Sequence, residues 1–265
     1  MTGMSTDRCL AVIEQYSAAL ADAARGNLGA RVEHCPDWDV ADLVWHVANV
    51  HWFWTTIAEE LPQAPPERAR PERPKDPDDL LAMFEAGARR MVDVLGAADQ
   101  SAACWTWAPQ KDVAFITRHQ VQEAMVHAWD AANAAGRTLE LDAGAAADAV
   151  EEFLTVSVSS AEDPADPPRP ALDGALWVCA CAGVEGPSPT WLVTDGPSPG
   201  TVAWQRVPDG TEPADLVTGV PLVGGHSDPA AFLLWLYGRV VDPFEGGVAG
   251  DTGVLTRFRA LTYTD

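Results

Sequence analysis

Two side chains of the kind that bind divalent metals, Glu123 and His127, are four residues apart in the sequence. On a helix this spacing is about one turn, so both side chains project from one face and can reach the same ion. One pair does not complete a metal site. A further ligand has to come from another segment, and an earlier apolar stretch offers His46 and His51. The sequence therefore predicts a metal centre built between two helices.

Two histidines and one carboxylate are the ligand set of a catalytic zinc site, in which one coordination position stays open, whereas sites closed by four protein ligands are structural. Iron and manganese accept the same donors, so the set predicts a divalent metal more firmly than it predicts zinc. The spacing alone has little specificity. A glutamate four residues before a histidine is common in helices, a histidine beside a tryptophan is often a core residue, and the chain lacks His-Glu-x-x-His.

The first 160 residues predict a helical bundle, because alanine-rich segments carry apolar residues at steps of three and four. The expected helices span residues 6–26, 39–60, 78–98, 115–135 and 145–157. Asp39 is the expected N-cap of the second helix, and the proline-rich stretch 62–77 is expected to be irregular. His46 then lies on the second helix and Glu123 and His127 on the fourth. Facing helices of a bundle commonly build metal sites from such positions.

The composition changes between residues 162 and 174, where repeated prolines exclude a regular helix or a central strand. We therefore expect a bundle domain over residues 1–162, a linker over 163–174 and a second domain over 175–265. The elements expected in the second domain are strands at 176–182, 190–194 and 201–207 and a helix at 229–240. The predicted fold class is mainly α with α+β, a four-helix bundle followed by a small α+β domain.

The net charge narrows the class of partner, and the cysteines indicate the compartment. The chain has 39 acidic and 17 basic residues, and a net charge of −22 repels phosphate backbones and anionic membranes. No apolar run approaches the roughly 20 residues that span a bilayer. Five cysteines without a Cys-x-x-Cys pair, and an N-terminal segment unlike a signal peptide, are typical of a reducing compartment. We expect a cytoplasmic protein that binds neither nucleic acid nor membrane.

Two segments that contain the candidate ligands also contain longer sequence motifs. Residues 35–46 read Cys-Pro-Asp-Trp-Asp-Val-Ala-Asp-Leu-Val-Trp-His, and residues 118–130 read Arg, four residues, Glu, three residues, His-Ala-Trp-Asp. Both resemble the mycothiol-dependent maleylpyruvate isomerase family, which is part of the DinB-like metalloenzyme superfamily. The apolar segment 232–239, which ends in Gly-Arg, is similar to part of that family's C-terminal domain. The resemblance covers nearly the whole chain.

The resemblance implies a DinB-like four-helix bundle in which His46, Glu123 and His127 hold zinc. His51 is then a bystander or a pocket residue, and His119 is expected to face away. The resemblance also implies mycothiol as the low-molecular-weight thiol cofactor, and a thiol coordinated to zinc is deprotonated. The thiolate would add to an electrophilic carbon of a small-molecule substrate. Addition, bond rotation and elimination give cis–trans isomerisation, whereas retention of the sulfur makes the protein an S-transferase.

Four further residues are candidates for the site. Arg239 is expected to anchor the substrate or the thiol, since a guanidinium binds carboxylates bidentately, or else to be a surface arginine that interacts with a helix end. Asp130 is expected to orient the ligand His127 or to be a structural hydrogen-bond partner. Arg118 and Trp129 are candidates for cofactor binding. For Trp129, core packing is the alternative role.

Two other functions remain open on the sequence alone. A metal hydrolase would use the same open zinc site to activate water and would need no thiol. A non-catalytic small-molecule-binding protein would retain the bundle without catalysis and would be purified without metal. The proline-rich segments at 62–77 and 163–170 can reshape the entrance to the site, so the sequence does not name the substrate.

Overall fold

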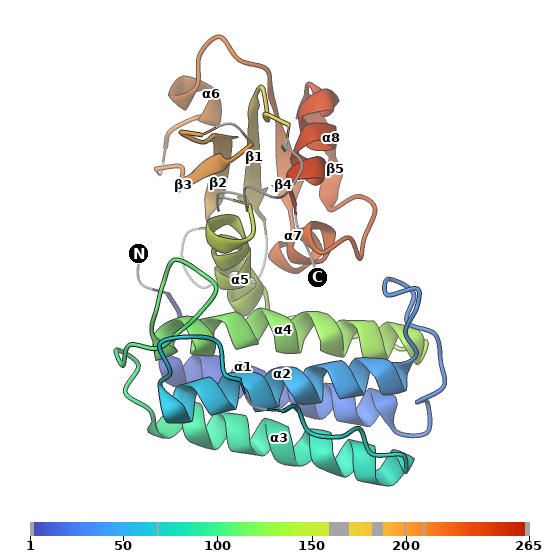
Figure 1. Ribbon diagram of the computed structural model, residues 1–265. Helices are drawn as coiled ribbons and strands as arrows, with labels where there is room; N and C mark the ends of the chain where they lie inside the picture. The colour runs from blue at the N-terminus through green and yellow to red at the C-terminus, as the bar shows by residue number, and fades with distance from the viewer. Residues whose placement is uncertain are drawn as a thin grey trace. The chain divides into compact units, whose positions relative to one another are not determined.

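The computed structural model describes residues 3–67, 69–158, 170–181, 188–198, 200–208 and 210–262 (Figure 1). Contacts divide the chain into two compact units, the first up to Leu141 and the second from Asp142. The first unit consists of α1 (Thr6–Ala24), α2 (Val40–Glu60), α3 (Pro77–Ala97) and α4 (Val113–Ala134). These are four of the predicted helices, and they lie side by side (Figure 1).

Each helix of this bundle begins at a side chain that accepts a hydrogen bond from the backbone of the first turn. The caps are Ser5 for α1, Asp39 for α2, Asp76 for α3 and Asp112 for α4. Asp39 forms a capping box with Asp42, as helix starts of this composition favour. The described residues between α2 and α3 form neither helix nor strand, as the prolines predicted.

The helices of the bundle close into a ring. Both α1 and α2 pack against α3 and α4, so the α1–α3 seam and the α2–α4 seam lie on opposite sides. Large apolar side chains from all four helices are buried inside, among them Ile13, Tyr16, Leu43, Ile57, Phe84, Met91 and Met125. Each contributes about 1.5–3 kcal/mol by leaving water. This packing holds α2 and α4 in a fixed register.

Two ring contacts define that register. The ring centroids of His46 and His127 are 5.1 Å apart, and those of Trp54 and His119 are 6.0 Å apart. From the first contact to the second, the residue number rises from 46 to 54 on α2 and falls from 127 to 119 on α4. The two helices therefore run antiparallel. The N-terminal half of α2 therefore faces the C-terminal half of α4, which places His46 beside His127.

The second unit is an α+β fold, as predicted. Its helices are α5 (Ala143–Val156), α6 (Pro213–Leu216), α7 (Pro229–Leu236) and α8 (Thr252–Leu261). Its strands are β1 (Ala175–Ala180), β2 (Thr190–Asp195), β3 (Val202–Arg206), β4 (Leu222–Ser227) and β5 (Phe244–Gly250). They form one sheet in the order β3-β2-β1-β4-β5, in which β1 and β4 are parallel and the other neighbours are antiparallel. In this unit α5 packs against α7.

The sequence did not predict β4, β5, α6 or α8. Both missed strands contain several glycines, a composition that favours turns. In β4, packing requires a glycine at position 224, because a Cβ there would overlap the carbonyl oxygen of Trp177 on the neighbouring strand. In β5, Gly250 has a φ of +107°, which disfavours other residues. The formation of β4 and β5 therefore depends on contacts with neighbouring strands, which a local sequence pattern does not reveal.

The division into units falls earlier than the predicted boundary at residue 162. Contacts group α5 with the sheet unit, whereas the sequence assigned it to the bundle domain. The predicted linker at 163–174 lies largely outside the described residues. Among the residues that the structure describes, no helix has both the length and the apolar character needed to cross a bilayer.

A buried carboxylate ties the sheet to α5 within the second unit. Glu151 accepts a hydrogen bond of 3.0 Å from the indole N–H of Trp191 and another from the guanidinium of Arg206. Both Glu151 and Trp191 are buried.

Replacing Glu151 with alanine should lower the free energy of unfolding by about 2–3 kcal/mol, because a buried indole N–H loses its acceptor. Urea unfolding followed by tryptophan fluorescence measures this change. Glu151→Gln keeps an acceptor for Trp191 and should lose about half as much. Equal stability of the alanine variant and the wild type would contradict this role.

Candidate metal centre

The structure brings together the three residues that were predicted as metal ligands. One ligand atom each from His46, Glu123 and His127 lies within 4.8 Å of the others. His46 comes from α2, and Glu123 and His127 come from consecutive turns of α4. The antiparallel register of α2 and α4 thus places the third donor beside the pair that one helix supplies.

His127 is held between two carboxylates. Its Nε2 lies 3.3 Å from Oε2 of Glu123, and its Nδ1 lies 3.2 Å from Oδ2 of Asp130. An ionised carboxylate only accepts hydrogen bonds, so Nδ1 carries a proton and donates a hydrogen bond to Asp130. This contact fixes the orientation of the ring and directs Nε2 toward Glu123 and His46. Asp130, whose side chain is fully buried, therefore lies where an orienting residue would lie.

The cluster is strongly charged. Burial alone would lower the pKa of His127, but the carboxylates of Asp130 and Glu123 outweigh it and raise the pKa to about 9. Burial alone would raise the pKa of Glu123, but the hydrogen bond and charge of His127, with the charges of His119 and His46, lower it to about 2. At neutral pH Glu123 is therefore an anion and His127 of the metal-free protein is a cation.

These residues fit a divalent metal. Oε2 of Glu123 is buried, and its charge is balanced by Nε2 of His127 at 3.3 Å. A metal ion between this oxygen and the two imidazoles would take the place of the Nε2 proton as the counter-charge. The three donors are two nitrogens and one oxygen, the set that catalytic zinc sites use while one position stays open.

Trp38 packs on a residue of the cluster, whereas Trp129 packs on His34. The indole of Trp38, just before α2, lies 4.8 Å from the ring of His46. The predicted residue Trp129 lies 5.8 Å from the ring of His34 and is partly exposed. Trp38 belongs to the segment that carried the family resemblance, but its contact with His46 depends on how the chain enters α2. The sequence therefore gave no signal for that contact.

The prediction for His119 was wrong. Its side chain does not face away from the site: it is buried, and its Nε2 lies 3.9 Å from Oε1 of Glu123. The ring packs against Trp54 and Phe115. Phe115 lies one turn earlier on α4, but Trp54 comes from α2, so spacing along one helix was a poor guide to the direction of His119.

His51 lies on another face of α2. It is buried, and its ring stacks on Phe84 of α3 at a centroid distance of 5.4 Å. Burial lowers its pKa to about 4, although the charge of Glu123 opposes this shift. His51 is therefore neutral at physiological pH and contributes no charge beside the cluster.

The two predicted arginines lie in different units. Arg118 is partly buried on α4, one turn before Gln122. Arg239 follows α7 in the second unit, is only 7 % exposed, and donates a hydrogen bond of 2.7 Å to the carbonyl of Tyr237 at the end of that helix. This contact matches the predicted interaction with a helix end, except that the residue is buried rather than on the surface.

Comparison with known protein families matches residues 9–132 to the mycothiol maleylpyruvate isomerase N-terminal domain. No curated protein and no solved structure matched the chain. The matched segment contains His46, Glu123, His127 and Asp130, and it ends before the second unit begins. The family resemblance read from the sequence is thereby confirmed for the helical bundle, whereas its extension to residues 232–239 stays a prediction. The bundle of this chain is similar to the mycothiol maleylpyruvate isomerase N-terminal domain over residues 9–132.

Proposed function

We propose that the protein is a zinc-dependent enzyme that activates a low-molecular-weight thiol, mycothiol, for addition to an electrophilic small molecule. The observation that carries the proposal is the cluster of His46, Glu123 and His127, in which one ligand atom from each residue lies within 4.8 Å of the others and the carboxylate of Glu123 pairs with His127. The family match supports the thiol. The cluster supports the metal, because it collects donors that are costly to bury without a cation.

His46, Glu123 and His127 would hold the zinc, and Asp130 would keep His127 in the tautomer that presents Nε2. Zinc held there supplies an open coordination position at which a thiol loses its proton near neutral pH. The ring of Trp38 adds apolar surface beside His46. An apolar wall excludes water and so favours reaction of the substrate with a thiolate rather than with water.

The reaction proposed for the thiolate is reversible addition to an activated carbon–carbon double bond. The sulfur bonds to one alkene carbon, and the electron pair of the double bond moves to the conjugated carbonyl. Rotation about the resulting single bond and elimination of the thiolate restore the double bond with the opposite geometry. The thiol is regenerated, so the net change is a cis–trans isomerisation. If protonation traps the adduct before elimination, the same addition gives S-transfer.

Loss of either histidine should abolish tight zinc binding. We expect about one zinc per chain in the wild type, and at least about 100-fold weaker binding in His46→Ala and His127→Ala, since changes around zinc ligands alone cost about 10–100-fold. Elemental analysis and a competitive chelator titration measure both quantities. The control is His226→Ala, which removes an exposed histidine of the second unit. Unchanged zinc content in all three variants would contradict the site.

Zinc binding should release about one proton per site at pH 7, because His127 of the metal-free protein has a pKa of about 9 and must lose its proton. The release should fall toward zero as the pH rises through 9. Calorimetric titration with zinc in buffers of different ionisation enthalpy measures it. Asp130→Asn removes a carboxylate that raises this pKa, so it should release fewer protons near pH 8. Equal release by the wild type and Asp130→Asn would contradict the role of Asp130.

Turnover should require both zinc and thiol. With a cis-configured maleylpyruvate-type substrate, we expect isomerisation only when mycothiol is present, and a loss of at least about 100-fold in Glu123→Gln, which keeps the shape of the side chain but removes the charge. Absorbance follows the isomerisation, and mass spectrometry detects any product that retains the sulfur. Zinc-dependent hydrolysis without a thiol would replace this proposal with the hydrolase alternative.

A further inference from the structure

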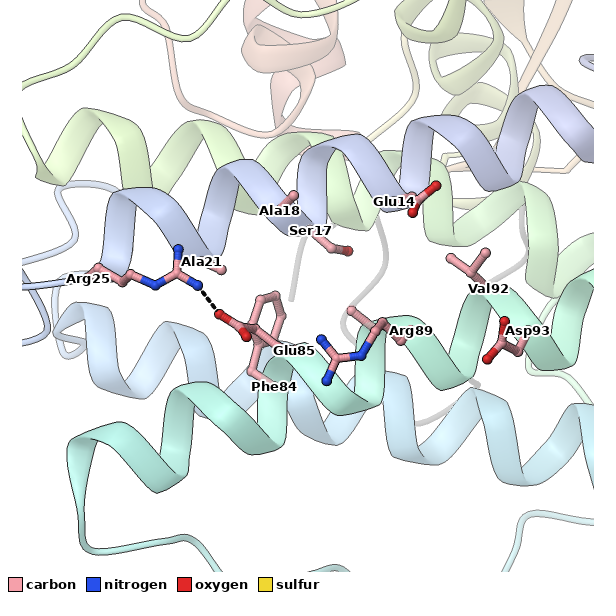
Figure 2. Close-up of a pocket in the computed structure, with 11 residues that line it drawn as sticks. Glu14, Ser17, Ala18, Ala21, Arg25, Phe84, Glu85, Arg89, Val92 and Asp93 are labelled. Carbon is pink, nitrogen blue, oxygen red and sulfur yellow. Dashed lines mark hydrogen bonds and ion pairs between the residues drawn. The ribbon is translucent and has the colours of Figure 1, made fainter.

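A cavity opens in the bundle, away from the metal cluster. It has a volume of about 470 Å³ and lies between α1 and α3, and we call it the α1–α3 cavity (Figure 2). None of the proposed zinc ligands lines it, and the α2–α4 seam that holds them is on the opposite side of the ring. Small-molecule sites in proteins typically occupy roughly 300–1,000 Å³. The cavity is therefore large enough for a ligand of its own.

The middle of the cavity combines an apolar surface with one polar atom that has no hydrogen-bond partner among the described residues. Its lining includes Ala18 and Ala21 of α1 and Phe84 and Ala88 of α3, and the short alanine side chains leave the space open. Ser17 is 5 % exposed, and its Oγ makes no hydrogen bond with the described part of the chain. Leaving a buried hydroxyl unpaired costs about 1–3 kcal/mol. A polar group of a ligand would satisfy it.

Three charged side chains adjoin this middle section. At one end Arg25 pairs with Glu85, so this arginine is already neutralised. Arg89, Glu14 and Asp93 are exposed and form no ion pair with any residue that the structure describes. Figure 2 shows the guanidinium of Arg89 turned toward Phe84 rather than toward Asp93, although Asp93 is only one helical turn away. Within the described part of the chain, the cavity thus presents one cation and two anions that have no charged partner.

We propose that the α1–α3 cavity binds a small zwitterion with an apolar body, the chemistry of an apolar α-amino acid. The carboxylate would pair with Arg89 and accept a hydrogen bond from the hydroxyl of Ser17. The ammonium group would lie toward Asp93 and Glu14. The apolar side chain would pack on Phe84 and the alanines. A simple anion would be repelled by the two carboxylates and a simple cation by Arg89, so only a ligand with both charges matches all three groups.

The test uses three probes of matched shape on the full-length, zinc-loaded protein. L-Phenylalanine carries both charges, 3-phenylpropionate only the carboxylate and 2-phenylethylamine only the ammonium. Calorimetry and saturation-transfer NMR measure their binding. We expect phenylalanine to bind at least about tenfold more tightly than either comparator, since each lacks one charged contact. Equal affinity of phenylalanine and one comparator, or no binding of phenylalanine, would overturn the proposal.

A matched pair of variants locates the binding. Arg89→Gln should weaken phenylalanine binding about tenfold. Arg90→Gln is the control, because Arg90 is the next residue on α3 but pairs with Glu59 of α2 outside the cavity, and this variant should bind like the wild type. Ser17→Ala should also weaken binding. Zinc content should be unchanged in all three variants, which separates this outcome from failure of the zinc site. Thermal unfolding should be unchanged in the two arginine variants, whereas Ser17→Ala should unfold at a slightly higher temperature because it removes a buried hydroxyl that has no partner among the described residues. Wild-type affinity in Arg89→Gln would overturn the assignment.

Discussion

The contacts of His127 with Glu123 on one side and Asp130 on the other are the interaction on which the functional part of the bundle depends. All three residues lie on α4, so a single helix assembles an alternating chain of opposite charges. Buried charges are costly unless they are paired, and this pairing allows α4 to carry them inside the bundle. His46 of α2 completes the cluster only while the two helices keep their antiparallel register. A slip of one turn would move it by about 5.4 Å, beyond reach of the others. The packing of Trp54 against His119 further along the same seam opposes such a slip.

Stability alone does not explain the composition of the α2–α4 pair. The buried side-chain atoms that lack hydrogen-bond partners among the described residues are mostly on these two helices: Asn49 Oδ1, His51 Nδ1, Thr55 Oγ1 and Gln120 Nε2, in addition to Glu123 Oε2, which has the ion pair with His127. Apolar residues at these positions would remove the cost of about 1–3 kcal/mol that each unpaired polar atom carries. Polar groups retained at such a cost are typical of functional sites, where stability is traded for chemistry. The sheet unit offers a contrast, because there the buried Glu151 has partners in Trp191 and Arg206.

The sequence predicted the bundle and the ligand positions because both leave local signals. Caps, prolines and apolar periodicity act within a few residues, and the ligand spacing on α4 is itself local. The features that the sequence did not predict depend on contacts between distant segments. The direction of His119 depends on the ring of Trp54 from α2, and β4 and β5 are glycine-rich strands whose glycines permit close approach between strands. The pairing of His46 with His127 required the family resemblance, because nothing in either segment alone records which turns of two helices will meet.

The placement of α4 explains how one bundle can hold both a polar site and a rigid core. Ala124, Ala128 and Ala131 lie on one face of this helix and are buried, while Glu123 and His127 lie on another face beside α2. Small side chains let a neighbouring helix approach closely, and α1 is the helix that packs most extensively on α4. Close contact on the alanine face restrains α4 without using the positions that carry the ligands. The alanine face adjoins the face of Glu123 and His127, because successive helical residues are about 100° apart, so the packing of α1 on α4 also restrains the candidate metal ligands.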